Sequence, residues 1–257
     1  MAQNKKNTPQ YRLHKGGLIS DFNSIEADAI IRLQTNIEFA SLDKKITCFA
    51  VTSAQEAEGK TTTSCNLALL YAEKGLKVCL LDFDLRQPAV HKAFDLKNSL
   101  GLVDFVKGDC EISDIIQHAG KVDVVTPGSH TPFPTKILQS PRTVELINEL
   151  KKQYDYIIID TPPVLVLSDA YLIGQHVDGY LVVCSQHISK KKDVVAACHS
   201  LEEKRMNIIG ITMVKVTTDE DQGKGGYGYQ AKYGYGYGYG YGYHHKDKEE
   251  KKESEEK

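Results

Sequence analysis

The fold is decided by the stretch Val51-Thr-Ser-Ala-Gln-Glu-Ala-Glu-Gly-Lys-Thr-Thr-Thr63, which follows an apolar run and opens an amphipathic segment. A loop between a strand and a helix can bind phosphate, because N–H groups at the helix start point at the oxygens and the helix dipole attracts negative charge. Gly59, Lys60 and Thr61 match the end of the pattern GxxxxGK[ST], whereas Ala54 replaces its first glycine. We predict that Lys60 reaches the β- and γ-phosphates of a nucleotide and that Thr61 binds magnesium. The alternative is a strand–turn–helix with an incidental Gly-Lys-Thr.

Two later apolar runs end in carboxylates. Asp82 and Asp84 close the run that starts at Val78, and Asp160 closes the run that starts at Tyr156. Carboxylates two residues apart in an extended chain point the same way, so they can hold Mg²⁺ while one accepts a proton from a hydroxyl. Asp160 stands where phosphate-loop proteins carry a second acidic residue near the metal. Each run alone is also typical of an ordinary polar turn, but the three segments in this order indicate a nucleotide site.

Short apolar runs alternate with longer amphipathic segments along most of the chain. The runs, expected as strands, are Ile46–Thr52, Val78–Leu81, Val122–Val125, Tyr156–Ile159, Tyr180–Cys184 and Ile208–Val214. The expected helices are Ser24–Ala40, Thr61–Lys74, Pro141–Gln153 and Ser189–Met206. Val- and Ile-rich runs of this length suit strands buried on both faces of a sheet. The alternation predicts an α/β domain with a doubly wound, mostly parallel sheet of the P-loop NTPase type.

The composition changes abruptly after Val216. Residues 223–243 are almost entirely Gly and Tyr, and a run of Lys and Glu ends the chain. Such a tract cannot bury a core, because glycine raises the entropic cost of ordering and the charged end stays solvated. We therefore expect a flexible N-terminus over residues 1–20, one domain over 21–217 and a flexible, disordered tail over 218–257.

Composition narrows the possible partners and compartment. A net charge of -2 gives no electrostatic case for nucleic-acid binding. The six cysteines are scattered without a CxxC pair, so nothing points to a zinc site or an oxidising compartment. The first residues lack the apolar stretch of a signal peptide, and no run approaches the roughly 18 apolar residues of a membrane span. We expect a cytoplasmic protein that contacts a membrane only through a partner.

The phosphate-loop segment and the two apolar runs that end in aspartates resemble the Walker A, Walker A′ and Walker B motifs of the bacterial tyrosine kinases. That family includes the cytoplasmic kinases of capsule and exopolysaccharide assembly. The likeness covers about residues 20 to 217, and it extends to Thr35-Asn36-Ile37, to Arg86 with Pro88, and to Ser168-Asp169-Ala170. The strings DFDLR and IIIDTPP are fairly specific for this family among phosphate-loop proteins.

The resemblance implies a protein-tyrosine kinase that uses ATP and Mg²⁺. Lys60, Asp82 and Asp84 would be catalytic, with the two aspartates as base and metal-site acid in an order that the sequence leaves open. The implied magnesium ligands are Thr61, Asp84 and Asp160. The implied nucleotide-binding residues are Ala57, Glu58, Gly59, Lys60, Thr61 and Thr62.

The tyrosine-rich tail is the implied substrate. Eight of the fourteen tyrosines lie in it, and glycine spacing lets each phenol enter an active site in extended form. Each phosphorylation would add about -1.5 to -2 charges. The expected phosphoacceptors are Tyr227, Tyr229, Tyr233, Tyr235, Tyr237, Tyr239, Tyr241 and Tyr243. The alternative is a low-complexity aromatic linker.

The resemblance also implies partners and a cellular role. It implies a transmembrane activator of the chain-length-regulator type, which would recruit the protein to the inner face of the cell membrane. A phosphotyrosine phosphatase and a homo-oligomer are implied as well. The output would be control of exopolysaccharide or capsule synthesis.

The chain departs from the family pattern at several positions. The loop carries Glu56-Ala57 where Pro-Gly or a similar pair is usual, and Val214 stands where an asparagine is often found near the base. The helix before the loop lacks the Glu-x-x-Arg-x-x-Arg pattern of ring assembly, because those places hold Asp28, Ile31 and Gln34. Ring formation through that contact is therefore not expected.

These departures keep alternative functions open. One is a non-kinase nucleotide switch, either an inactive kinase homologue or an ATPase of the MinD/ParA type. The MinD/ParA ATPases carry a signature lysine five residues before the loop lysine, and Gln55 occupies that place here. A third possibility is a scaffold whose tail is the functional part, for which no nucleotide dependence is expected.

Overall fold

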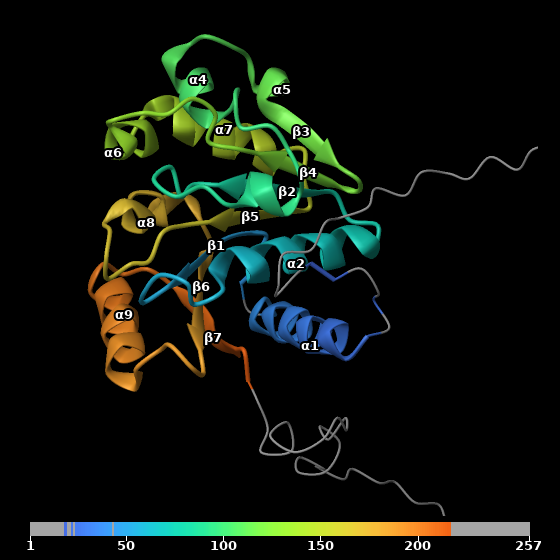
Figure 1. Ribbon diagram of the computed structural model, residues 1–257, viewed down its shortest axis with the longest axis vertical. Helices are drawn as coiled ribbons and strands as arrows, with labels where there is room; N and C mark the ends of the chain where they lie inside the picture. Colours follow the sequence, from blue (N-terminus) through green and yellow to red (C-terminus); the bar gives the residue numbers. More distant parts are fainter. Residues whose placement is uncertain (1–17, 20–21, 23, 43, 217–257) are drawn as a thin grey trace, which may run out of the picture. The chain divides into compact units, whose positions relative to one another are not determined.

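The computed structural model describes residues 18–19, 22, 24–42 and 44–216. At its centre is a seven-stranded sheet with the order β3-β4-β2-β5-β1-β6-β7 (Figure 1). Its strands are β1 Cys48–Ser53, β2 Val78–Asp82, β3 Ile116–Ala119, β4 Val122–Val125, β5 Tyr156–Asp160, β6 Gly179–Ser185 and β7 Ile208–Val214. All neighbouring strands are parallel except the antiparallel pair β3–β4. The predicted doubly wound, mostly parallel sheet is confirmed.

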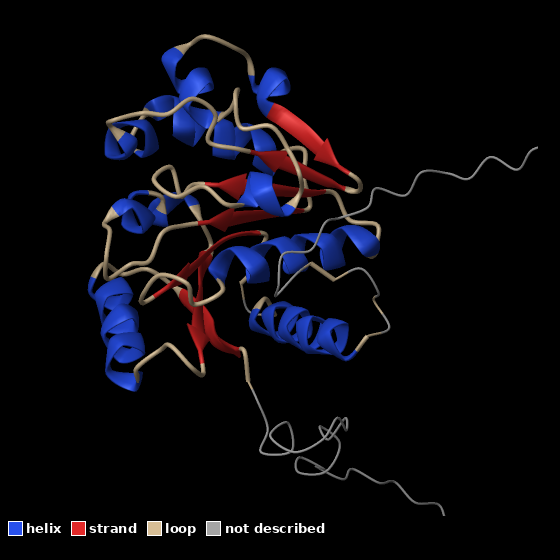
Figure 2. Ribbon diagram, viewed as in Figure 1, coloured by secondary structure: helices blue, strands red, loops and turns tan. Residues whose placement is uncertain are grey.

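Helices cover both faces of the sheet (Figure 2). They are α1 Ile25–Ala40, α2 Lys60–Glu73, α3 Val90–Ala93, α4 Leu102–Lys107, α5 Ile112–Ile115, α6 Pro134–Leu138, α7 Pro141–Lys151, α8 Asp169–Leu172, the 3₁₀ turn η1 Gly174–His176 and α9 Lys191–Glu203. One apolar core joins the sheet to α4, α7 and α9, and a second joins its other face to α1 and α2. Alternate side chains of each central strand enter opposite cores, which explains the continuous apolar runs in the sequence.

The strand register sets the position of the candidate site. β5 lies between β1 and β2, with Val51 opposite Asp160 on one side and Asp82 opposite Asp160 on the other. The three segments singled out in the sequence therefore leave the sheet at the same edge, side by side. Ligands of open α/β sheets bind at this carboxyl edge.

The long elements match their predicted boundaries closely. The helix expected from Ser24 begins at Ile25, and the Ser24 hydroxyl caps it by accepting the N–H of Ala27 at 3.1 Å. The sequence did not predict β3 or the five helices of four to six residues. Such segments are too short to show a period of their own.

No helix in the described part of the chain has the length and apolar character needed to cross a membrane. The predicted tail and all eight of its tyrosines lie outside the described residues, so their role stays a prediction.

Candidate nucleotide site

The loop between β1 and α2 has the backbone of a phosphate cradle. Gly59 caps α2 with a φ of 98°, a left-handed conformation that favours glycine. A Cβ at this position would lie 3.0 Å from Cγ2 of Val214, the residue at the end of β7. Ala57 is also left-handed, with a φ of 59°, and its carbonyl accepts a hydrogen bond from Nζ of Lys215 at 3.0 Å. Residues at the end of β7 therefore help to stabilise the conformation of the loop.

The carboxylate of Glu58 faces the protein interior. It is fully buried, accepts the Gln55 N–H at 2.8 Å and accepts the hydroxyl of Ser189 from the loop after β6. Only the backbone of Glu58 is therefore placed to bind phosphate. Glu56, the residue that departs from the family pattern, is exposed and accepts a hydrogen bond from Gln87 at 3.4 Å.

The start of α2 is joined directly to the end of β5. The Thr61 hydroxyl donates to Oδ2 of Asp160 at 2.6 Å, and the Ser64 hydroxyl donates to Oδ1 at 3.1 Å. The Lys60 side chain is buried, and it forms no salt bridge with any residue that the structure describes. Burial raises the pKa values of Asp160 and Asp84, and the charge of Lys60 acts against this rise. Lys60 is thus a buried cation that makes no ion pair within the described part of the chain, which suits a phosphate site.

Asp82 is held by backbone N–H groups. Its Oδ2 accepts the N–H groups of Ala89 and Val90 at 3.0 Å each, and its Oδ1 accepts that of Asp84 at 3.2 Å. Burial raises the pKa of Asp82 well above its usual value, and the charge of Asp160 raises it further. β2 ends at Asp82, and the Phe83 N–H continues the pairing with β5 by donating to the carbonyl of Asp160 at 2.8 Å.

Asp84 and Asp160 complete a cluster of three acidic side chains. Burial raises the pKa of Asp160 to about 6, with Lys60 and the Thr61 hydroxyl acting against it. Burial also raises the pKa of Asp84, although the N–H of Gln87 donates to its Oδ1 at 3.0 Å. A cation bound here would offset the free-energy cost of ionising three carboxylates that are buried close together.

The donor set suits Mg²⁺ bound together with phosphate. Carboxylates and the Thr61 hydroxyl are hard oxygen ligands, and Mg²⁺ usually keeps waters and takes one or two carboxylates beside substrate phosphates. Within the described residues, no three His, Cys, Asp or Glu side chains are arranged to hold a metal by themselves. Thr61 and Asp160 are therefore the protein ligands that fit best, with the remaining positions left for phosphate and water.

Arg86 lies beside this cluster and is fixed by a two-point ion pair. Its Nε is 2.8 Å from Oδ2 of Asp169, and a second guanidinium nitrogen is 3.3 Å from Oδ1. Asp169 is buried at the start of α8, whereas the Arg86 side chain is 39% exposed. A hollow of about 270 Å³ opens here, lined by Arg86 with Leu85, His130 and Pro134 among others.

The structure brings together the predicted residues Lys60, Thr61, Asp82, Asp84 and Asp160. Sequence reasoning noticed Arg86 and Asp169 only as points of family likeness, because nothing in their spacing shows that they pair. It missed the roles of Ser189 and Lys215 entirely. Both side chains act through contacts more than 100 residues away along the chain, for which one sequence carries no signal.

Comparison with known proteins agrees with this geometry. A family model described as an AAA domain matches residues 48–189. The chain is 36% identical over 192 residues to tyrosine-protein kinase YwqD of Bacillus subtilis, an alignment covering 74% of this chain and 81% of YwqD.

Solved structures show the same relationship. The kinase domain of the Escherichia coli tyrosine kinase ETK superposes with a TM-score of 0.76 at 30% identity, covering 93% of this chain and 88% of that one. The septum site-determining protein MinD of Pyrococcus horikoshii, solved with Mg-ADP, shares the fold with a TM-score of 0.55 at 24% identity, covering 64% of this chain and 68% of that one. The specific likeness is thus to the kinases, and the chain belongs to the family of bacterial tyrosine-protein kinases.

Proposed function

We propose that the protein is an ATP-dependent protein-tyrosine kinase that phosphorylates the tyrosine cluster of its own tail, Tyr227 to Tyr243. The observation that carries the proposal is the meeting of Lys60, Thr61 and the three aspartates at one edge of the sheet. Mg²⁺ would neutralise developing charge on the transferred phosphoryl group when bound. The loop N–H groups and Lys60 orient the triphosphate, so catalysis consists mainly of positioning and charge stabilisation.

The transfer forms a bond between the phenol oxygen and the γ-phosphorus and breaks the bond from that phosphorus to the bridging oxygen of ADP. The phenol proton must go to a base. Three backbone N–H groups bind the two oxygens of Asp82, which is 1% exposed, whereas Asp84 is bound by the N–H groups of Gln87 and Arg86 and is 8% exposed. We therefore assign the proton to Asp84, whose raised pKa also suits a base.

The hollow beside Arg86 is the proposed entrance for the acceptor tyrosine. It adjoins Asp84 through the chain, and Leu85 and Pro134 give it apolar walls that suit a phenol ring. The Asp169 carboxylate holds the Arg86 guanidinium in place at the edge of this hollow. Arg86 is thus a positioning residue in the proposed reaction.

The cellular role is proposed from the family. The protein would work at the inner face of the cell membrane, bound to a transmembrane activator of the chain-length-regulator type. It would assemble as a homo-oligomer, be reset by a phosphotyrosine phosphatase, and regulate exopolysaccharide or capsule synthesis. A nucleotide switch is the second candidate, but Gln55 occupies the place of the lysine that MinD/ParA ATPases use there.

The test is incubation of the full chain with Mg-ATP, with and without the cytoplasmic segment of a candidate activator, followed by mass spectrometry for phosphotyrosine. We expect phosphate on Tyr227 to Tyr243 in the wild type and none in Lys60→Met. Lys45→Met is the matched control, because Lys45 is an exposed lysine before β1 and makes no salt bridge with the described residues.

Truncation after Thr218 removes the proposed acceptors and should abolish autophosphorylation while leaving ATP binding intact. ATP binding without phosphotyrosine under every activator condition would reject the kinase and favour the nucleotide switch. Absence of nucleotide binding would instead favour the scaffold.

A further inference from the structure

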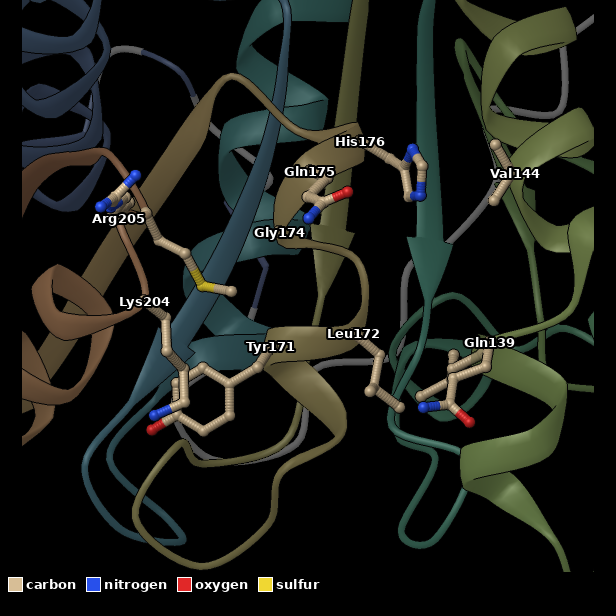
Figure 3. A pocket seen from close by; sticks show the side chains of 11 residues that line it. Gln139, Val144, Tyr171, Leu172, Gly174, Gln175, His176, Lys204 and Arg205 are labelled. Carbon is tan, nitrogen blue, oxygen red and sulfur yellow. The ribbon is translucent and has the colours of Figure 1, made fainter.

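One pocket in the described part of the chain lies apart from the nucleotide site. It measures about 410 Å³ and lies between α8, η1, the turn from α9 to β7, and the segment joining α6 to α7. Figure 3 shows the eleven side chains that line it. Because η1 and the α9–β7 turn precede β6 and β7, these walls belong to the amino edge of the sheet, whereas the phosphate loop lies at the carboxyl edge.

The lining combines cations with an apolar floor. Lys204, Arg205 and His176 line the pocket together with Tyr171, Leu172 and Met206, and no Asp or Glu is among the eleven lining residues. Arg205 forms no salt bridge with the described residues. Nζ of Lys204 lies 4.4 Å from the centroid of the Tyr171 ring. A ligand that carries both aromatic and anionic groups matches this lining.

The side chains that can bind an anion are distributed around the pocket and do not converge on one point. Lys204 and Arg205 lie on one side of it, and His176 lies on the other, with Gln175 between them (Figure 3). The arrangement therefore suits an extended ligand that bears several anionic groups.

The chain itself contains a segment that phosphorylation would turn into such a ligand. From Tyr233 to Tyr243 every second residue is tyrosine, so in an extended chain all six phenols share one face. Phosphates on them would form a row of aromatic anions. The charged end of the tail is a poorer match, because residues 246–257 hold five lysines and six acidic residues, a net charge of -1.

We propose that this pocket is a binding site for the phosphorylated tyrosine tail of a second copy of the chain. The phosphates would pair with Lys204 and Arg205 and accept a hydrogen bond from the His176 ring, and the phenol rings would pack on Tyr171, Leu172 and Met206. The proposal rests on the proposed function for the origin of its ligand, but the site can be tested without any kinase activity.

The test measures binding of a fluorescein-labelled peptide with the sequence of residues 233–243 and three phosphotyrosines. The protein is the full chain with Lys60→Met, whose own tail stays unphosphorylated. Fluorescence anisotropy is expected to show saturable binding of the phosphopeptide and at least tenfold weaker binding of the unphosphorylated peptide. Adding Lys204→Glu and Arg205→Glu should weaken phosphopeptide binding about tenfold or more, since two ion pairs become repulsive.

Two further variants control for charge and folding. Lys192→Glu reverses an exposed charge on α9 that does not line the pocket, and it should change the affinity less than twofold. Arg205→Gly removes the guanidinium and suits the backbone, because Arg205 has a φ of 57°. It should weaken binding without lowering the melting temperature.

Three results would overturn the proposal: no binding of the phosphopeptide, equal binding of the unphosphorylated peptide, or equal binding to the Lys204→Glu/Arg205→Glu protein. A chain that binds the phosphopeptide in the pocket but never autophosphorylates would reject the proposed kinase function and retain the site. A chain that autophosphorylates but shows one of the three results would support the proposed kinase function and reject the phosphopeptide site.

Discussion

Thr61 and Asp160 are linked by a 2.6 Å hydrogen bond that joins the start of α2 to the end of β5. The two residues lie 99 positions apart, yet they form the centre of the proposed magnesium site. Asp160 is buried among two other aspartates, so its charge is costly in the absence of a bound cation.

Asp160→Asn should therefore separate stability from function. We expect the ligand-free variant to melt a few degrees higher than the wild type at pH 7.5, since a buried charge is removed and about 1 kcal/mol corresponds to roughly 2–4 °C in a protein of this size. The further rise in melting temperature on adding Mg-ATP should be lost. Differential scanning fluorimetry checks both, and a variant that melts lower and keeps its Mg-ATP shift would contradict the placement of the metal.

The raised pKa of Asp160 predicts how stability depends on pH. Its pKa is about 6 in the folded protein, above the usual 3.8. The folded state then holds a proton that the unfolded state has released, so this group lowers the free energy of unfolding as the pH rises from about 4 to about 6. The loss is up to about 3 kcal/mol. Urea unfolding across this range should show the fall in the wild type and a smaller fall in Asp160→Asn.

Gly59→Ala should damage the phosphate loop for two separable reasons. A left-handed backbone costs an alanine about 1–2 kcal/mol, and the new methyl group would press on Val214 at 3.0 Å. Adding Val214→Ala should recover the part of the lost stability and ATP affinity that is due to this contact. The part that is due to the left-handed backbone should remain lost. Urea unfolding and ATP titration of the two single variants and the double variant measure the coupling. Strictly additive effects would show that Val214 does not press on the loop.

The pairing of Arg86 with Asp169 predicts an asymmetric double-mutant cycle. Among the described residues, Arg86→Met leaves the buried Asp169 carboxylate with the Thr135 hydroxyl at 3.5 Å as its side-chain donor, so the change should cost about 1–3 kcal/mol of stability. Asp169→Asn in the same protein should restore part of this loss, because the unpaired charge is gone. Phosphotransfer should stay low in both, as Arg86 is needed at the acceptor hollow. Full recovery of transfer in the double variant would contradict that role for Arg86.

Much of the framework could be predicted because its signals are local. Each motif can be recognised within about ten residues: an apolar run that ends in an aspartate, or a Gly-Lys-Thr before an amphipathic segment. The topology of a parallel sheet then places Lys60, Asp82 and Asp160 at one edge. The direction of the Glu58 carboxylate could not be predicted, since it depends on Ser189 from another loop. The contacts of Asp82 could not be predicted either, because its N–H donors Ala89 and Val90 lie at the start of a helix too short to recognise in the sequence.

The single turn α8 connects the ion pair at Arg86 with the pocket at the amino edge of the sheet. Its first residue, Asp169, holds Arg86, and its last two residues, Tyr171 and Leu172, line the pocket at the amino edge of the sheet. If filling the pocket shifts this helix and changes the affinity for ATP by some factor, thermodynamic linkage requires ATP to change the affinity for the pocket's ligand by the same factor. Each copy would then hold or release its neighbour according to the nucleotide that it carries.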